Sequence, residues 1–140
     1  MANAPPNLFF AGFIGQEELR DAYCGADVFA FLSLEETAGI VVLEALSCGI
    51  PVVLRDIPVY RGWLEDGVQV WMARDTPGFE QRIRGILSGT LPDLTTAGRE
   101  AVRERSLEAV GEQLKQIHEG KLPEAKRSQF GKNVKQEVII

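Results

Sequence analysis

The chain has 140 residues, of which 45% are hydrophobic and 25% charged, as is ordinary for one folded domain, and no apolar run is long enough to span a membrane. Residues 121–140 hold five basic and two acidic side chains, which gives this segment a net charge of +3. Since the whole chain has a net charge of −5, residues 1–120 carry a net charge of −8. We therefore expect an acidic folded domain over residues 1–120 that does not bind nucleic acid, followed by a basic C-terminal tail over residues 121–140.

Short apolar segments alternate with helical ones in the first half of the chain. The continuous apolar run over residues 8–13 predicts a strand that is buried on both faces of a sheet, and residues 27–32 and 51–54 predict two further strands. Residues 16–23 predict one helix between them and residues 39–48 another, which ends at Gly49 with Pro51 beyond it. This alternation indicates parallel βαβ units, and so an α/β fold with a Rossmann-like parallel sheet and flanking helices.

The second half of the chain carries a weaker pattern. Residues 60–64 predict a helical turn, and Asp66 with Gly67 predicts a turn that leads into the apolar run 68–73. Residues 79–87 are amphipathic, and residues 95–119 predict one long or broken helix. Its apolar inner stripe would consist of Ala97, Ala101, Leu107, Val110, Leu114 and Ile117.

Two glutamates, Glu36 and Glu44, flank a glycine-opened apolar stretch at the start of the second helix. The stretch is apolar on every side except at Glu44, so we expect a buried helix whose one charge is paired, solvated or turned toward a ligand. Thr37 is the expected N-cap, and the first-turn amides beside Gly39 would then form an anion site. The pattern predicts a phosphate cradle between two hydroxyl-binding carboxylates, which suits a nucleoside-diphosphate sugar.

Each glutamate also has a purely structural interpretation. Glu36 would then be a solvated loop residue, and Glu44 would pair with a surface Lys or Arg. Open parallel sheets bind ligands outside the carboxyl ends of their strands, where residues 12–15 and 33–39 lie. That position favours a ligand for the pair of glutamates together.

The chain offers no pattern for metal or triad chemistry. Cys24 and Cys48 lack metal-ligand spacing, and the single histidine, His118, has no partner for a nucleophilic triad. We expect both cysteines to be small buried hydrophobes with reduced thiols. Neither a metal ion nor a cofactor is expected, no Gly-x-Gly-x-x-Gly supports a dehydrogenase, and without a signal-peptide pattern we expect a cytoplasmic location.

The positions that carry a family resemblance are Phe10, Gly12, Leu19, Tyr23, the run 26–29, Ser33, Glu36, the runs 39–41 and 43–45, Gly49, the run 51–53, Asp66 and Gly67. In their order and spacing they resemble the C-terminal, donor-binding half of family-4 glycosyltransferases. These are retaining enzymes of the GT-B fold, in which two Rossmann-like domains face a cleft. Residues 35–37, 55–60 and 62–64 look closest to bacterial glycolipid synthases, which transfer glucose or galactose to diacylglycerol or to a glycosyl-diacylglycerol.

The resemblance implies a role for each residue of the motif. Glu36 would contact the hydroxyls of the donor sugar, as the predicted catalytic residue. The backbone amides of Ala38, Gly39 and Ile40 would hold sugar and phosphate oxygens, and Glu44 would bind the ribose hydroxyls. The donor would be UDP-glucose or a similar nucleotide sugar.

Three positions depart from the family pattern. Ala38 replaces an aromatic residue, Leu32 a proline, and Gly62 a glutamate that many members carry. These changes bear on the identity of the sugar more than on the nucleotide.

Family members also carry an acceptor domain and a basic phosphate-binding pair ahead of this region. We expect a partial GT-B domain that transfers no sugar on its own, and the alternative is a non-catalytic fragment that binds a nucleotide or a protein partner. The full enzyme would meet membrane lipid only peripherally. Residues 8–13 would be the fourth strand of the order 3-2-1-4-5-6, and its unpaired edge predicts a homodimer.

Overall fold

The computed structural model describes residues 5–121 and divides the chain into two compact units, Met1–Val102 and Arg103–Ile140. Within the described part of the first unit, a parallel sheet holds β1 (Phe29–Phe31), β2 (Val52–Arg55) and β3 (Trp71–Ala73) in that order. Val53, in the central strand, is in register with Ala30 on one side and with Trp71 on the other. The predicted α/β class with a parallel sheet is confirmed.

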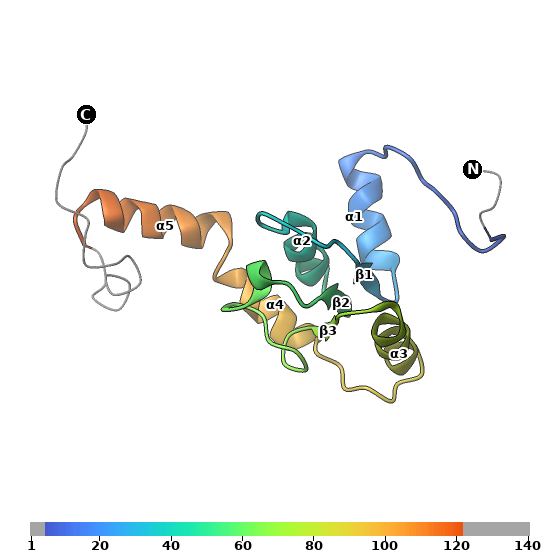
Figure 1. Ribbon diagram of the computed structural model, residues 1–140. Coiled ribbons are helices and arrows are strands. Elements are labelled where there is room, and N and C mark those ends of the chain that lie inside the picture. The colour runs from blue at the N-terminus through green and yellow to red at the C-terminus, as the bar shows by residue number, and fades with distance from the viewer. Residues whose placement is uncertain (1–4, 122–140) are drawn as a thin grey trace. The chain divides into compact units, whose positions relative to one another are not determined.

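Side chains of the central strand alternate between two hydrophobic cores. Val52 and Leu54 are buried in a core that α2 (Ile40–Cys48) also enters, whereas Val53 is buried in a second core with Phe79 of α3 (Thr76–Leu87). Figure 1 shows α1 (Gln16–Gly25) and α2 on one side of the strands and α3 on the other. This is the three-layer packing that a parallel sheet buried on both faces requires.

Two further segments complete the first unit. The helix α4 (Thr95–Arg103) packs on the core that holds α2, and a Cβ added at Gly98 would lie 2.7 Å from Leu46 Cδ2. A short 3₁₀ helix, η1 (Pro58–Tyr60), follows β2. The predicted turn at Asp66 is present, and its carboxylate accepts hydrogen bonds from the Met72 amide (2.8 Å) and from Arg82 (3.0 Å).

Residues 8–13 do not form the predicted strand. They are irregular and precede α1, with Phe9 87% exposed and Phe10 60% exposed. A strand there would be held by a single ladder to the three-residue β1, which is too little to fix an apolar segment that no helix covers. The strand edge on which the predicted homodimer was based is therefore not present, and the dimer itself stays a prediction.

The C-terminal helical stretch is broken, as one of the two predicted forms allowed. α4 ends at Arg103, and α5 (Leu107–His118) begins after Ser106, whose hydroxyl accepts a hydrogen bond from the Ala109 amide (3.1 Å). The predicted inner stripe is wrong for α5, since Leu107, Val110, Leu114 and Ile117 are all exposed. Among the described residues, this unit contains only that one helix, so the stripe has no partner within its own unit.

Two remaining expectations concern the thiols and the tail. Cys24 is exposed, contrary to prediction, because the buried position at this end of α1 is taken by Tyr23; Cys48 is half-buried. The tail lies outside the described residues except for Lys121. None of the helices in the described range has the length and apolar character that crossing a membrane requires.

Candidate functional site

The loop that joins β1 to α2, residues 32–39, lies at the carboxyl edge of the sheet. Arg55, at the end of β2, donates from Nε to the Leu32 carbonyl (3.1 Å) and from Nη1 to the Arg74 carbonyl beyond β3 (2.6 Å). The Ser33 hydroxyl donates to the Glu35 carbonyl within the loop (2.7 Å). One guanidinium therefore ties together the ends of all three strands at the edge where parallel sheets bind ligands.

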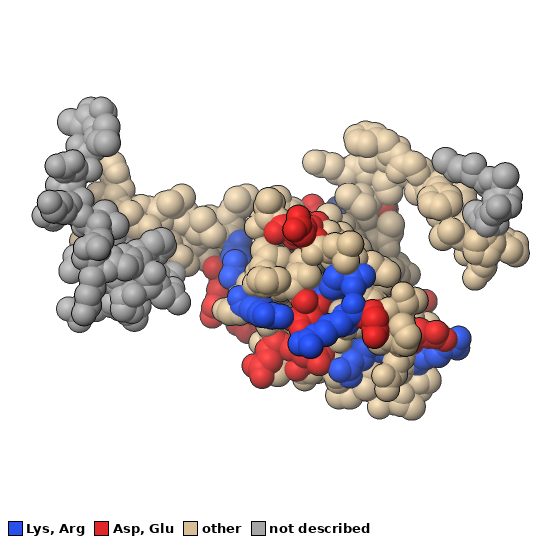
Figure 2. Space-filling model, viewed as in Figure 1, with Lys and Arg blue, Asp and Glu red and all other residues tan. Residues whose placement is uncertain are grey.

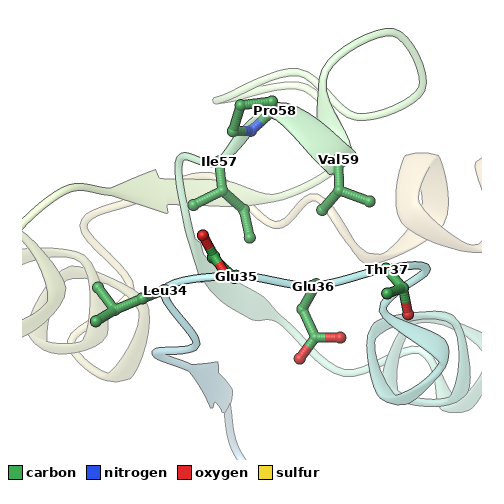
Figure 3. A pocket seen from close by; sticks show the side chains of 7 residues that line it. All are labelled: Leu34, Glu35, Glu36, Thr37, Ile57, Pro58 and Val59. Carbon is green, nitrogen blue, oxygen red and sulfur yellow. The ribbon is translucent and has the colours of Figure 1, made fainter.

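A hollow of about 490 Å³ opens between this loop and the start of η1. Its lining comes from Leu34, Glu35, Glu36 and Thr37 on one side and from Ile57, Pro58 and Val59 on the other, as Figure 3 shows. Glu36 is half-buried, and its carboxylate is turned away from Pro58 and Val59. The hollow has the size of an ordinary small-molecule site, and the Glu36 carboxylate lies beside it, just before α2 begins.

Gly39 is the residue at which the loop becomes a helix. Its backbone is left-handed (φ 65°, ψ 44°), and its carbonyl accepts hydrogen bonds from the amides of Val42 (2.9 Å) and Leu43 (3.4 Å). No side chain caps the helix, so the prediction that Thr37 is the N-cap is wrong: the left-handed turn at Gly39 takes that position.

The first turn of α2 carries no acidic side chain, and Ala38 and Ile40 on either side of Gly39 are both exposed. The amides at this end precede the first intrahelical hydrogen bond, and in sequence they follow the loop residue Glu36. The positive end of the helix dipole is therefore open to a negatively charged ligand.

Glu44 is exposed, so α2 is not the fully buried helix that was expected, and its charge is solvated, as one of the expected alternatives allowed. Only one face of α2 is buried, through Val42, Ala45 and Leu46, and Glu44 lies on the same outer face as the exposed Ile40. The Tyr23 hydroxyl donates a hydrogen bond to the Glu44 carboxylate (3.2 Å). Burial, followed by the charge of Glu44, raises the pKa of Tyr23 to about 12.

Tyr60 was not predicted as a site residue, although it is the buried side chain that contacts the start of α2. Its side chain is 0% exposed, and a Cβ added at Gly39 would lie 2.7 Å from Tyr60 Cε1 and 2.8 Å from its hydroxyl oxygen. Burial, followed by the charge of Glu36, raises the pKa of Tyr60 to about 12. The sequence marks Tyr60 only as the last residue of the run 55–60 that resembles glycolipid synthases, because its contact with Gly39 exists only after the chain has folded.

A charged cluster around Asp56 was also not predicted. Asp56 accepts hydrogen bonds from Arg61 (3.1 Å) and from Arg74 (2.9 Å), and the hydrogen bond from Arg74 is the main reason that its pKa is lowered. Figure 2 shows acidic and basic side chains interleaved on the face that it presents. The signal that could have marked the cluster is the pair Arg55 and Asp56 directly after a buried strand.

The described residues contain no group of three or more His, Cys, Asp or Glu side chains that could hold a metal ion. The polar side chains that line the hollow are Glu35, Glu36 and Thr37, and the amides at the start of α2 follow them directly in sequence. Such groups can bind the oxygens and the hydroxyls of one ligand without a bridging cation.

The sequence of residues 2–97, about two thirds of the chain, matches the family model described as glycosyl transferases group 1. This chain belongs to the group 1 glycosyltransferases. The match includes the whole loop, the start of α2 and η1, so the candidate site lies within the family's own region.

Two curated relatives of this glycosyltransferase are glycolipid enzymes. The processive diacylglycerol alpha-glucosyltransferase of Acholeplasma laidlawii is 39% identical over 117 residues, which are 84% of this chain and 35% of that protein. The alpha-galactosylglucosyldiacylglycerol synthase of Streptococcus pneumoniae is 35% identical over 113 residues, 77% of this chain and 29% of the relative. The chain thus spans about a third of the length of these relatives.

Among solved structures, Anabaena HepE in complex with UDP-glucose superposes with a TM-score of 0.61 at 20% identity. The match covers 71% of this glycosyltransferase chain and 29% of that one. It shows that the parallel sheet with flanking helices is similar to a GT-B glycosyltransferase domain, as the sequence predicted.

Proposed function

We propose that this chain is the nucleotide-sugar-binding part of a retaining hexosyltransferase whose donor is a UDP-sugar and whose acceptor is a diacylglycerol-type lipid. The observation that carries the proposal is the open N-terminus of α2, which lies between Glu36 and Glu44 at the carboxyl edge of the sheet. The two glycolipid relatives support the class of acceptor, and the UDP-glucose complex of the similar structure supports the class of donor.

Each group at the site has a matching group on the proposed donor. The amides of Ala38, Gly39 and Ile40 would bind diphosphate oxygens, as amides at a helix N-terminus do. The absence of a side chain at Gly39 leaves room for the ring of Tyr60. Glu36 would accept hydrogen bonds from the sugar hydroxyls. Glu44, on the outer face of the same helix, would accept them from the ribose hydroxyls.

The contribution of these groups to catalysis would be mainly electrostatic. The bond from the sugar to the diphosphate breaks with the development of negative charge on the phosphate oxygens. Preorganised amides at a helix N-terminus stabilise such charge without reorganising during the reaction. Glu36 would hold the sugar in place while its anomeric carbon reacts.

Isothermal titration calorimetry with UDP and with UDP-glucose tests the proposal. Replacing Glu44 by alanine removes charge-assisted hydrogen bonds of about 1.5–3 kcal/mol, so affinity for both ligands should fall roughly ten- to a hundred-fold. Glu44→Gln keeps an acceptor for the Tyr23 hydroxyl and isolates the effect of the charge. Glu80→Ala is the matched control, because Glu80 is an exposed glutamate on α3 whose partner is Arg84. Equal affinities for wild type and Glu44→Ala would contradict the assignment.

One observation favours a protein-interaction function as a second candidate. Leu8, Phe9, Phe10 and Phe13 are 50%, 87%, 60% and 105% exposed, a concentration of large apolar side chains that is typical of contact surfaces. A homodimer that covers them would appear in light scattering as a species larger than one chain of 15.4 kDa. Such a species without any UDP binding would favour this second candidate. Sugar transfer to diacylglycerol by the purified chain would instead establish an enzyme complete in itself.

A further inference from the structure

Tyr60 carries a buried hydroxyl that has no hydrogen-bond partner. Its side chain is 0% exposed, and among the described residues it is the one whose buried side-chain oxygen lacks a partner. The ring is held in place by the backbone of η1, through a hydrogen bond from the Tyr60 amide to the Ile57 carbonyl (3.2 Å), and by Trp63, whose ring centroid is 6.3 Å away. An unpaired buried hydroxyl is unfavourable, so its retention in a well-packed core calls for a partner that arrives later.

The Tyr60 hydroxyl lies beside Gly39, where the loop joins α2. Its oxygen is 2.8 Å from the place that a Cβ on Gly39 would occupy, so the phenol fills the space that glycine leaves open. Glu36 is on the same loop, and its negative charge acts on the phenol. The pKa of Tyr60 near 12 keeps the phenol protonated at neutral pH, and it is therefore a hydrogen-bond donor.

We propose that Tyr60 is a positioning residue: when a nucleotide sugar binds at the start of α2, the Tyr60 hydroxyl donates a hydrogen bond to the Glu36 carboxylate and fixes it against the sugar hydroxyls. This inference rests on the proposed function. A carboxylate is the favoured acceptor, because hydrogen bonds to a charged oxygen are about twice as strong as those to a neutral one. Glu36 is half-buried and lies three residues before Gly39, the residue against which the phenol packs.

The variant Tyr60→Phe separates this role from a structural one. It keeps the ring that packs against Gly39 and removes only the hydroxyl. If the residue were merely structural, deleting an unpaired hydroxyl would leave the melting temperature unchanged or raise it and would leave ligand affinity unchanged. The proposal predicts the same effect on the ligand-free melting temperature, but a roughly ten-fold loss of affinity for UDP-glucose.

UDP without the sugar is the internal control, because Glu36 is expected to contact the sugar and not the nucleotide. Tyr60→Phe should weaken UDP-glucose and leave UDP unchanged in calorimetric titrations. In a Glu36→Gln background, the further change Tyr60→Phe should have much less effect on UDP-glucose, since the charged acceptor has been removed. Equal loss for UDP and UDP-glucose would overturn the proposal, as would an undiminished loss in the Glu36→Gln background.

The outcomes also distinguish this inference from the function on which it rests. If the wild-type chain binds neither UDP nor UDP-glucose, the proposed function fails and the role of Tyr60 fails with it. If the wild type binds both and Tyr60→Phe binds both equally well, only the role of Tyr60 fails. Selective loss of UDP-glucose in Tyr60→Phe supports both.

Discussion

Replacing Gly39 by alanine should destabilise the fold by two separable mechanisms. The backbone at Gly39 is left-handed (φ 65°), which costs an alanine about 1–2 kcal/mol. The new Cβ would also lie 2.7 Å from Tyr60 Cε1, closer than packed carbon atoms approach. Tyr60 is fully buried and cannot move into solvent, so the overlap adds about 1–3 kcal/mol, as overpacking of a core does.

The sum, roughly 2–5 kcal/mol, is a large part of the 5–15 kcal/mol by which such domains are usually stable. Urea unfolding, followed by the fluorescence of Trp63 and Trp71, measures the free energy of unfolding of each variant. Both tryptophans lie in or beside the two cores, so their signal reports the global transition.

Gly89→Ala is the matched control for the backbone effect. Gly89 has nearly the same left-handed angle (φ 68°), but a Cβ there would meet nothing within 4 Å. It should therefore lose only the backbone contribution of about 1–2 kcal/mol, and any unfolded-state effect of the change from glycine to alanine is common to both variants. Equal destabilisation of the two variants would refute the contact between Gly39 and Tyr60.

Three further outcomes follow from the site and its surroundings. UDP binding should be unchanged by EDTA, since helix-end amides rather than a divalent cation would hold the phosphates, and a strong loss on chelation would contradict this. Asp56→Asn should lower stability at pH 7 by about 0.2–1 kcal/mol in urea unfolding, because Arg74 and Arg61 are largely exposed. Because the pKa of Asp56 is lowered in the fold, this stabilisation is complete above the ordinary pKa of 3.8 and is lost as the pH falls through the lowered pKa. The free energies of unfolding of the wild type and the variant should therefore converge in acid, and a difference that persists there would argue against the ion pairs. Iodoacetamide at pH 8 should alkylate the exposed Cys24 before Cys48, because the pKa of Cys48 is raised by burial and then by the neighbouring Cys24 thiol. Peptide mass spectrometry measures the two rates of alkylation, and equal rates would contradict this prediction.

The elements that were predictable from sequence are those whose signals are local. The glycine–proline stop after α2 and the apolar run of β2 both contain the reason for their structure in adjacent residues. The left-handed conformation of Gly49 belongs to the same class, since glycine adopts it at little cost. The family motif then adds what local physics alone cannot give, the roles expected of the two glutamates.

The predictions that failed all depend on what lies next to a segment in space. Apolar residues 8–13 read as a buried strand, but burial needs a covering layer that these residues lack in the structure. The helix that carries Glu44 was expected to be buried because it is apolar in sequence, yet only one face of the short helix α2 meets the sheet. Tyr60 and the Asp56 cluster were not predicted because their partners lie in other segments of the chain.

Amide NMR of the ¹⁵N-labelled chain during titration with UDP-glucose tests the central claim most directly, because it locates the ligand without any substitution. If the open end of α2 holds the diphosphate, the amides of Ala38, Gly39 and Ile40 should show the largest shifts, and they should shift similarly with UDP. Largest shifts at residues 61–66, which line a separate hollow of about 550 Å³, would place the ligand elsewhere and contradict the claim, as would the absence of any shift at millimolar ligand.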